Sequence, residues 1–144
     1  MVVCADTSFL FALYGNDVHT PRAIAWTQEI GIAISITELA DYELGNALRF
    51  SEFSKRISSG KSAAYLAEYE ADRAAGRVRR QVCNLASLIH EAKRISATHT
   101  LAGGHRGFDV LHVAGALKLG AEQFLTFDGN QKKLAEVEGL LVPL

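Results

Sequence analysis

Cysteine and long apolar runs are both scarce in this 144-residue sequence. Their scarcity argues against a disulfide-rich protein and against a membrane-spanning one. The two cysteines, Cys4 and Cys83, are far apart and belong to no Cys-x-x-Cys pair. We therefore expect free, buried thiols in a reducing compartment rather than a disulfide framework or a zinc site. No apolar run approaches the ~20 residues of a membrane span, and the opening MVVCADTSFL lacks the basic segment of a signal peptide. We expect a cytoplasmic protein without a membrane partner.

The composition is that of one ordinary globular domain. Hydrophobic residues make up 49% of the sequence and charged residues 22%, which is typical of a chain that buries its own core. The sequence contains no internal repeat, linker or low-complexity segment that would mark a boundary. We predict a single domain that spans residues 1–144.

Positive charge is concentrated in the middle of the chain, although the formal net charge is only −1. Residues 49–94 hold ten of the fifteen lysines and arginines but five of the sixteen acids, a balance of +5, and the rest of the chain carries −6. This segment is either the solvated surface of a helical pair or a footprint for a phosphate backbone. On the second interpretation, the basic stretch near Arg73, Arg77, Arg79 and Arg80 binds nucleic acid.

Short apolar runs alternate with helical patterns along the whole chain. Strands are predicted at residues 2–5, 32–36, 123–127 and 140–142, and helices at residues 7–13, 19–30, 37–50, 62–75, 84–98, 105–120 and 132–137. Residues 77–80 are predicted as an exposed basic turn. The first three helices are expected to be capped by Thr7 or Ser8, by Thr20 and by Thr37 respectively. This order is typical of an α/β protein whose parallel sheet is covered by helices on both faces.

The stretch HRGFDVLHVAGALKLG, residues 105–120, organises the rest of the chain. Glycines precede the predicted helix, and Gly120 follows its end. Asp109 lies near the helix start, where the helix dipole favours a carboxylate. His112 and Ala116 share its face because they follow at i+3 and i+7. A carboxylate on this small, apolar face is unfavourable unless something compensates its charge.

Three further acids stand in positions of the same kind. Asp6 and Asp128 each follow a predicted strand, at the edge where open α/β folds bind ligands. Glu43 lies on or beside the apolar face of its helix, whereas Glu38 and Asp41 are expected to point more outward. A purely structural interpretation makes Asp6 a helix cap.

The four acids together predict a divalent metal site. Carboxylates gathered at one point repel and keep their protons unless a cation is present. All-oxygen ligands favour Mg²⁺ or Mn²⁺ over Zn²⁺. Since the sequence pairs no nucleophilic serine or cysteine with a base, the expected chemistry is attack of metal-activated water on a phosphodiester.

Two other classes remain open at this point. A phosphoaspartate receiver or phosphatase domain shares the sheet and the acids at its strand ends. A dehalogenase-type phosphatase needs a second acid two residues after the first, where this chain has Ser8, and a receiver needs a lysine where this chain has Asp128. The other class is a non-catalytic interaction module with a degenerate site, which the presence of all four acids argues against.

The chain resembles the PIN-domain ribonucleases of the VapC toxin type along essentially its whole length. Four segments carry the resemblance in order and spacing: ADTSFL, ELGNAL, GFDVLHVAGALKLGA and FLTFDGNQKKLA, which contain Asp6, Glu43, Asp109 and Asp128 respectively. The resemblance implies a three-layer αβα sandwich with a five-stranded parallel sheet. It also implies a metal-dependent endoribonuclease, the toxin of a type II toxin–antitoxin pair.

The same resemblance assigns roles and partners. It implies that Asp6, Glu43, Asp109 and Asp128 are catalytic and bind Mg²⁺ or Mn²⁺. It implies that Ser8, Thr126 and Asn130 support this site by hydrogen bonding. It further implies an RNA substrate, a homodimer and a cognate antitoxin that occupies the active site.

Overall fold

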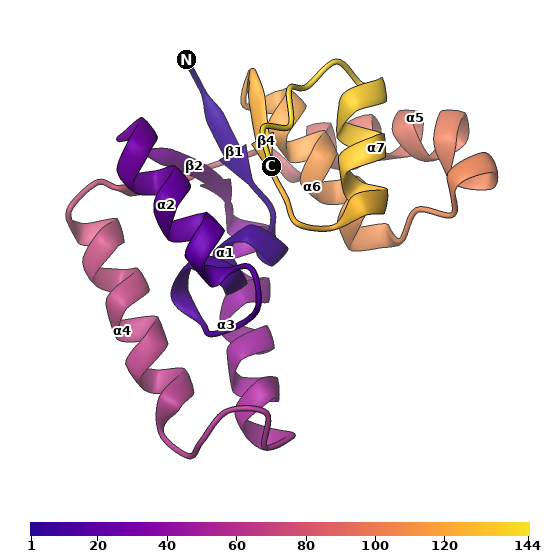
Figure 1. Cartoon of the computed structure of the whole chain (residues 1–144). Coiled ribbons are helices and arrows are strands. Elements are labelled where there is room, and N and C mark those ends of the chain that lie inside the picture. The colour runs from indigo at the N-terminus through magenta and orange to yellow at the C-terminus, as the bar shows by residue number, and fades with distance from the viewer.

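The computed structural model describes residues 1–144, and it places a parallel sheet between two layers of helices (Figure 1). The strands are β1 (Val3–Ala5), β2 (Ile34–Thr37), β3 (Val78–Gln81) and β4 (Gln123–Leu125). The helices are α1 (Thr7–Tyr14), α2 (Thr20–Ile30), α3 (Glu38–Phe53), α4 (Lys61–Ala74), α5 (Leu85–Gly103), α6 (Gly107–Lys118) and α7 (Gly129–Val137). The predicted αβα sandwich is confirmed.

The sheet has four strands in the order β3-β2-β1-β4, all parallel. The resemblance implied five, and the difference lies at residues 140–142, where a last strand was expected. There Leu141 makes only an isolated parallel bridge to Gln123. The segment is short because Gly139 turns the chain at a φ of +91° and Pro143 has no N–H with which to extend the ladder.

The predicted basic turn at residues 77–80 is wrong, because this segment belongs to the edge strand β3. Val78 is buried and pairs with Ile34, while Arg79 and Arg80 pair with the next two residues of β2 and are exposed. The sequence VRRQ has no apolar alternation from which a strand could be predicted. An edge strand tolerates such charge, and exposed arginines discourage its free edge from pairing with another chain.

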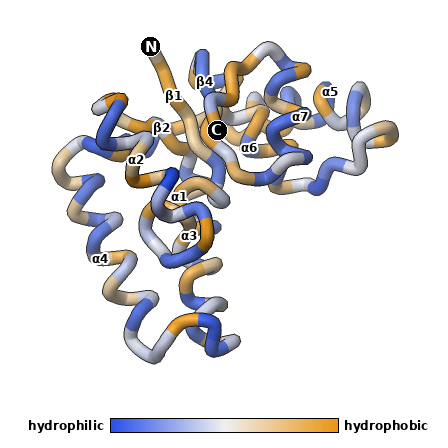
Figure 2. The backbone as a smooth tube through the Cα atoms, viewed as in Figure 1, coloured by the Kyte–Doolittle hydropathy of each residue, from blue (hydrophilic) through white to orange (hydrophobic).

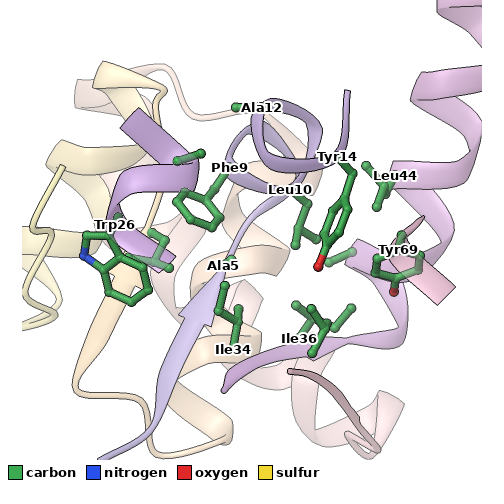
Figure 3. Close-up of a cluster of buried hydrophobic side chains, with 14 of the residues drawn as sticks. Ala5, Phe9, Leu10, Ala12, Tyr14, Trp26, Ile34, Ile36, Leu44 and Tyr69 are labelled. Atoms are coloured by element: carbon green, nitrogen blue, oxygen red, sulfur yellow. The ribbon is translucent and has the colours of Figure 1, made fainter. Parts of the chain in front are cut away.

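Each face of the sheet carries its own core. Helices α1 to α4 cover one face, where Phe9 packs edge-on against Trp26 and Tyr14 against Tyr69 (Figure 3). Trp26 is therefore a packing residue. Helices α5 to α7 cover the other face, and Cys4 of β1 packs there.

Both cysteines are free, and burial raises the pKa of the Cys4 thiol to about 12. None of the helices is both long and apolar enough to span a bilayer.

Two candidate acids begin helices. Asp6 is the N-cap of α1 and Asp128 that of α7, and each carboxylate accepts a backbone N–H of the helix that follows. The expectation that Thr7 or Ser8 caps α1 is therefore wrong, and α2 is preceded by His19 rather than capped by Thr20. A cap at a strand-to-helix junction holds its carboxylate at the carboxyl edge of the sheet.

Candidate metal centre

Asp6 is the buried member of the acidic group, with 3% of its surface exposed. It follows β1, and hydroxyl groups hold both of its carboxylate oxygens. Ser8 donates to Oδ1 at 2.6 Å and Thr126 donates to Oδ2 at 2.6 Å. Burial raises the pKa of this carboxyl group, and the bonds from Ser8 and Thr126 oppose the rise. The two hydroxyls predicted to support the site therefore fix the orientation of Asp6.

Glu43 faces the sheet edge from α3 and contacts His112 of α6. The distance from His112 Nε2 to Glu43 Oε1 is 3.0 Å, and the same nitrogen lies 3.3 Å from the hydroxyl of Thr7. His112 is 4% exposed. Its hydrogen bond is the main reason that the pKa of Glu43 is lowered, against a smaller opposing effect of burial. The imidazole therefore joins the helix of Asp109 to the helix of Glu43.

Asp109 and Asp128 share one cation, the guanidinium group of Arg106. Arg106 Nε donates to Asp109 Oδ2 at 3.1 Å, and its Nη2 lies 3.7 Å from Asp128 Oδ2. Asp109 is the main cause of the raised pKa of Arg106, and Asp128 and Glu43 add to the effect through their charges. Three of the four candidate acids thus act on a single side chain, which is 79% exposed.

The start of α7 positions Asp128 and braces α6. Asp128 Oδ1 accepts the backbone N–H groups of Asn130 and Gln131, each at 2.9 Å. The side chain of Asn130 points elsewhere, toward Gly103, so its support of the acidic site comes from its backbone rather than from its amide group. Gln131 is buried, and its amide donates to the main-chain carbonyl of Asp109 at 3.0 Å.

The carboxyl edge of the sheet therefore carries all four predicted acids, held from four different elements. As the side chains lie, no three histidine, cysteine, aspartate or glutamate groups form a metal-binding cluster. Their convergence on one ion stays a prediction. The donor chemistry nevertheless fits a divalent metal, because the acids offer oxygen atoms and a guanidinium already compensates the charge of Asp109 and Asp128.

The structure gives carboxylate partners to most of the predicted nucleic-acid-binding arginines. Arg73 and Arg80 both pair with Asp41, and Arg77 pairs with Asp72 at 2.6 Å. Arg79 forms no such pair. Most of the charge in this stretch is already compensated within the protein, and its role in nucleic-acid binding remains a prediction.

Sequence reasoning missed the site roles of Thr7, Arg106 and His112. His112 had a usable signal, since it shares the Asp109 face of α6. Arg106 had a weaker one, because an arginine three residues before an acid can pair with it along a helix. Thr7 had none, since its contact with His112 spans 105 residues of sequence.

Comparison with known proteins identifies the family and the fold. The sequence profile of the PIN domain matches residues 3–137. A search of curated proteins finds no significant match to the chain. Solved structures do resemble it.

Three of these structures superpose over nearly the whole chain. The Mycobacterium tuberculosis toxin VapC20, described as cleaving the sarcin–ricin loop, has a TM-score of 0.71 at 19% identity, covering 96% of each chain. VapBC2 from Rickettsia felis, bound to a DNA fragment from its promoter, has a TM-score of 0.68 at 15% identity, covering 99% of this chain and 97% of that one. PAE2754 from Pyrobaculum aerophilum has a TM-score of 0.65 at 18% identity, covering 99% and 83%. These similarities establish the shared fold.

Proposed function

The chain belongs to the PIN-domain family, and we propose that it is a metal-dependent endoribonuclease, the toxin of a type II toxin–antitoxin pair. The observation that carries the proposal is the set of four carboxylates at the carboxyl edge of the sheet, two of which share the exposed guanidinium of Arg106. RNA as substrate and the two free thiols both agree with a cytoplasmic protein.

In the proposed reaction the four carboxylates would hold Mg²⁺ or Mn²⁺. A bound divalent metal supplies an activated water for attack on a phosphodiester and stabilises negative charge on the phosphate. Ser8 and Thr126 keep both oxygens of Asp6 in a fixed orientation. His112 sets the position of Glu43. Arg106 stands at the rim, where a guanidinium freed from Asp109 can contact the phosphate of RNA.

Cleavage of a labelled single-stranded RNA tests the activity itself. We expect the purified protein to cut the RNA internally with Mn²⁺ or Mg²⁺ and to lose this activity in EDTA. Cleavage that persists in EDTA, or none with any divalent metal, would contradict the proposal. Phosphate transfer from a small phosphodonor onto Asp6 would instead identify a phosphoaspartate domain.

We also propose a cognate antitoxin and a homodimer. VapBC2 supports the antitoxin, because a toxin of the same fold is there part of a complex with its antitoxin.

An exposed apolar group at the start of α5 supports the homodimer. Val82, Leu85 and Ile89 are 83%, 65% and 42% exposed, and Leu85 and Ile89 share one helix face. A second copy that packs on this group would remove it from water.

Arg106 competes with the metal for the same carboxylates, if the proposed site is correct. Arg106→Gln removes the guanidinium between Asp109 and Asp128, so we expect Mn²⁺ to bind about 3- to 10-fold more tightly. Isothermal titration of Mn²⁺ into each protein measures this change. Arg79→Gln removes an exposed, unpaired arginine from β3 and should leave the affinity unaltered. Equal or weaker Mn²⁺ binding by Arg106→Gln would show that its guanidinium does not occupy the metal position.

A further inference from the structure

A basic hollow lies at the tip of the hairpin that α3 and α4 form, away from the acidic edge. The hairpin projects from the body of the molecule (Figure 1), and its tip carries hydrophilic segments with a hydrophobic one between them (Figure 2). The hollow measures about 970 Å³. Its lining includes four basic residues, one acid and an aromatic ring: Arg49, Lys55, Arg56, Lys61, Glu52 and Phe53.

The positive charge of this hollow is not compensated by the protein. None of its four basic side chains forms an ion pair, unlike Arg73, Arg77 and Arg80. The single acid is directed elsewhere, because Glu52 accepts the backbone N–H of Ser62 at 3.0 Å and its hydroxyl at 2.9 Å. These bonds hold the pKa of Glu52 below its ordinary value and close the loop between the two helices. The hollow therefore carries an excess of positive charge that no acidic side chain of the protein pairs with.

Exposed aromatic rings lead from the acidic edge to this hollow. Tyr42, Phe50 and Phe53 of α3 are 65%, 58% and 81% exposed. At 100° per residue the three rings project within about 80° of one another around the helix, beside Glu43. Phe53 also lines the hollow. The helix rises about 15 Å from Glu43 to Phe53, which is a span that a few nucleotides can cover.

One lysine of the hollow occupies an unfavourable backbone conformation. Lys55 is the single non-glycine residue with a positive φ, at +62°. It follows the end of α3, a position where glycine is the usual residue because a side chain is strained there. The chain thus carries a positive charge in the lining of the hollow in spite of the strain, which is typical of a functional position.

We propose that the hollow binds the phosphate backbone of single-stranded RNA while the aromatic rings of α3 stack on its bases. The proposal rests on the proposed function, since it describes how the hairpin holds a part of the substrate that extends from the acidic site. Uncompensated positive charge next to exposed aromatic rings is the combination that binds single strands without sequence preference. A polypeptide partner would not require four unpaired cations.

Fluorescence anisotropy with a labelled single-stranded oligoribonucleotide, in EDTA to prevent cleavage, tests the charges. We expect Arg56→Gln/Lys61→Gln to weaken binding about tenfold and to reduce the slope of log Kd against log salt by about one to two. Lys93→Gln/Lys133→Gln removes two exposed lysines from α5 and α7 and should change Kd less than twofold. Equal effects of the two pairs would overturn the proposal.

Two single variants separate the roles within the site. Phe53→Ala should weaken binding about tenfold with the salt slope unchanged, because stacking involves no counterion release. Lys55→Gly should melt at the same or a higher temperature than the wild type yet bind RNA more weakly, which a structural role for this lysine does not predict. Wild-type affinity in both variants would remove the hairpin from RNA binding.

Competition and cleavage complete the test. Poly-L-glutamate that displaces the RNA at equal concentration would identify an acidic protein segment as the occupant and overturn the proposal. Hairpin-dependent binding by a protein that cleaves no RNA would support this site and contradict the proposed activity. If Arg56→Gln/Lys61→Gln cleaves RNA with unchanged KM and Kd, the proposed activity is supported and the binding site at the hairpin is contradicted.

Discussion

Asp109→Asn should reduce RNA cleavage at least about 100-fold while the protein stays folded. The substitution preserves size but removes an anionic metal ligand, so metal affinity and water activation should both fall. In EDTA the free energy of unfolding should change by no more than about 1 kcal/mol. Removing one of several nearby acids relieves repulsion, while the pair with Arg106 that is lost is largely exposed.

Thermal melts and a cleavage assay measured side by side check this result. Excess Mn²⁺ should raise the melting temperature of the wild type but not that of Asp109→Asn, since only a protein that binds the ion is stabilised by it. Glu122→Gln, which removes an exposed acid before β4, should behave as the wild type in both assays. If Asp109→Asn cleaves normally and keeps the full Mn²⁺-induced shift, Asp109 serves only the start of its helix.

Gly115→Ala should lower the free energy of unfolding by about 1–3 kcal/mol, although alanine is the better helix former. Gly115 is buried in α6, and a β-carbon there would lie 2.7 Å from Thr37 Cγ2. Thr37 cannot easily move, because it ends β2 and its hydroxyl caps α3. The strain should therefore push α6, with Asp109, away from α3, with Glu43, and reduce cleavage as well.

A double-mutant cycle isolates that contact. Thr37→Ser removes Cγ2 but keeps the capping hydroxyl, so it should recover part of the stability lost in Gly115→Ala, with a coupling of about 1 kcal/mol. Gly129→Ala is the matched control, since its β-carbon would meet nothing within 4 Å. Urea unfolding of the four proteins gives the values. Strict additivity of the two substitutions would show that the methyl groups do not collide.

The sequence predicted the layers and the acidic edge because both depend on local patterns. Apolar runs marked β1, β2 and β4, and a carboxylate next to such a run, as in Asp6 and Asp128, is visible without knowing the fold. Asp109 and Glu43 were identified from helical spacing alone. Their placement at one edge then follows from parallel strand order.

What the sequence could not predict depends on partners far away in the chain. β3 is a strand only because β2 lies beside it, since three of its four residues are polar and exposed and only Val78 is buried. Thr126 reaches Asp6 across 120 residues. The sequence alone could not distinguish the unpaired basic residues of the hairpin from the paired arginines near β3. The reason is that a partner such as Asp41 is distant from Arg80 in sequence. Pairing of this kind is tertiary information.

The residues of one core precede most of those of the other along the chain. This order determines at what stage of protein synthesis the acidic site can form. Residues 1–81 contain three strands and the four helices that cover one face of the sheet, whereas the opposite face waits for α5 to α7. A growing chain that has left the ribosome as far as β3 carries Asp6 and Glu43 but neither Asp109 nor Asp128. On the proposed function, competence to cut RNA then arrives only with the last segments, after most of translation is complete.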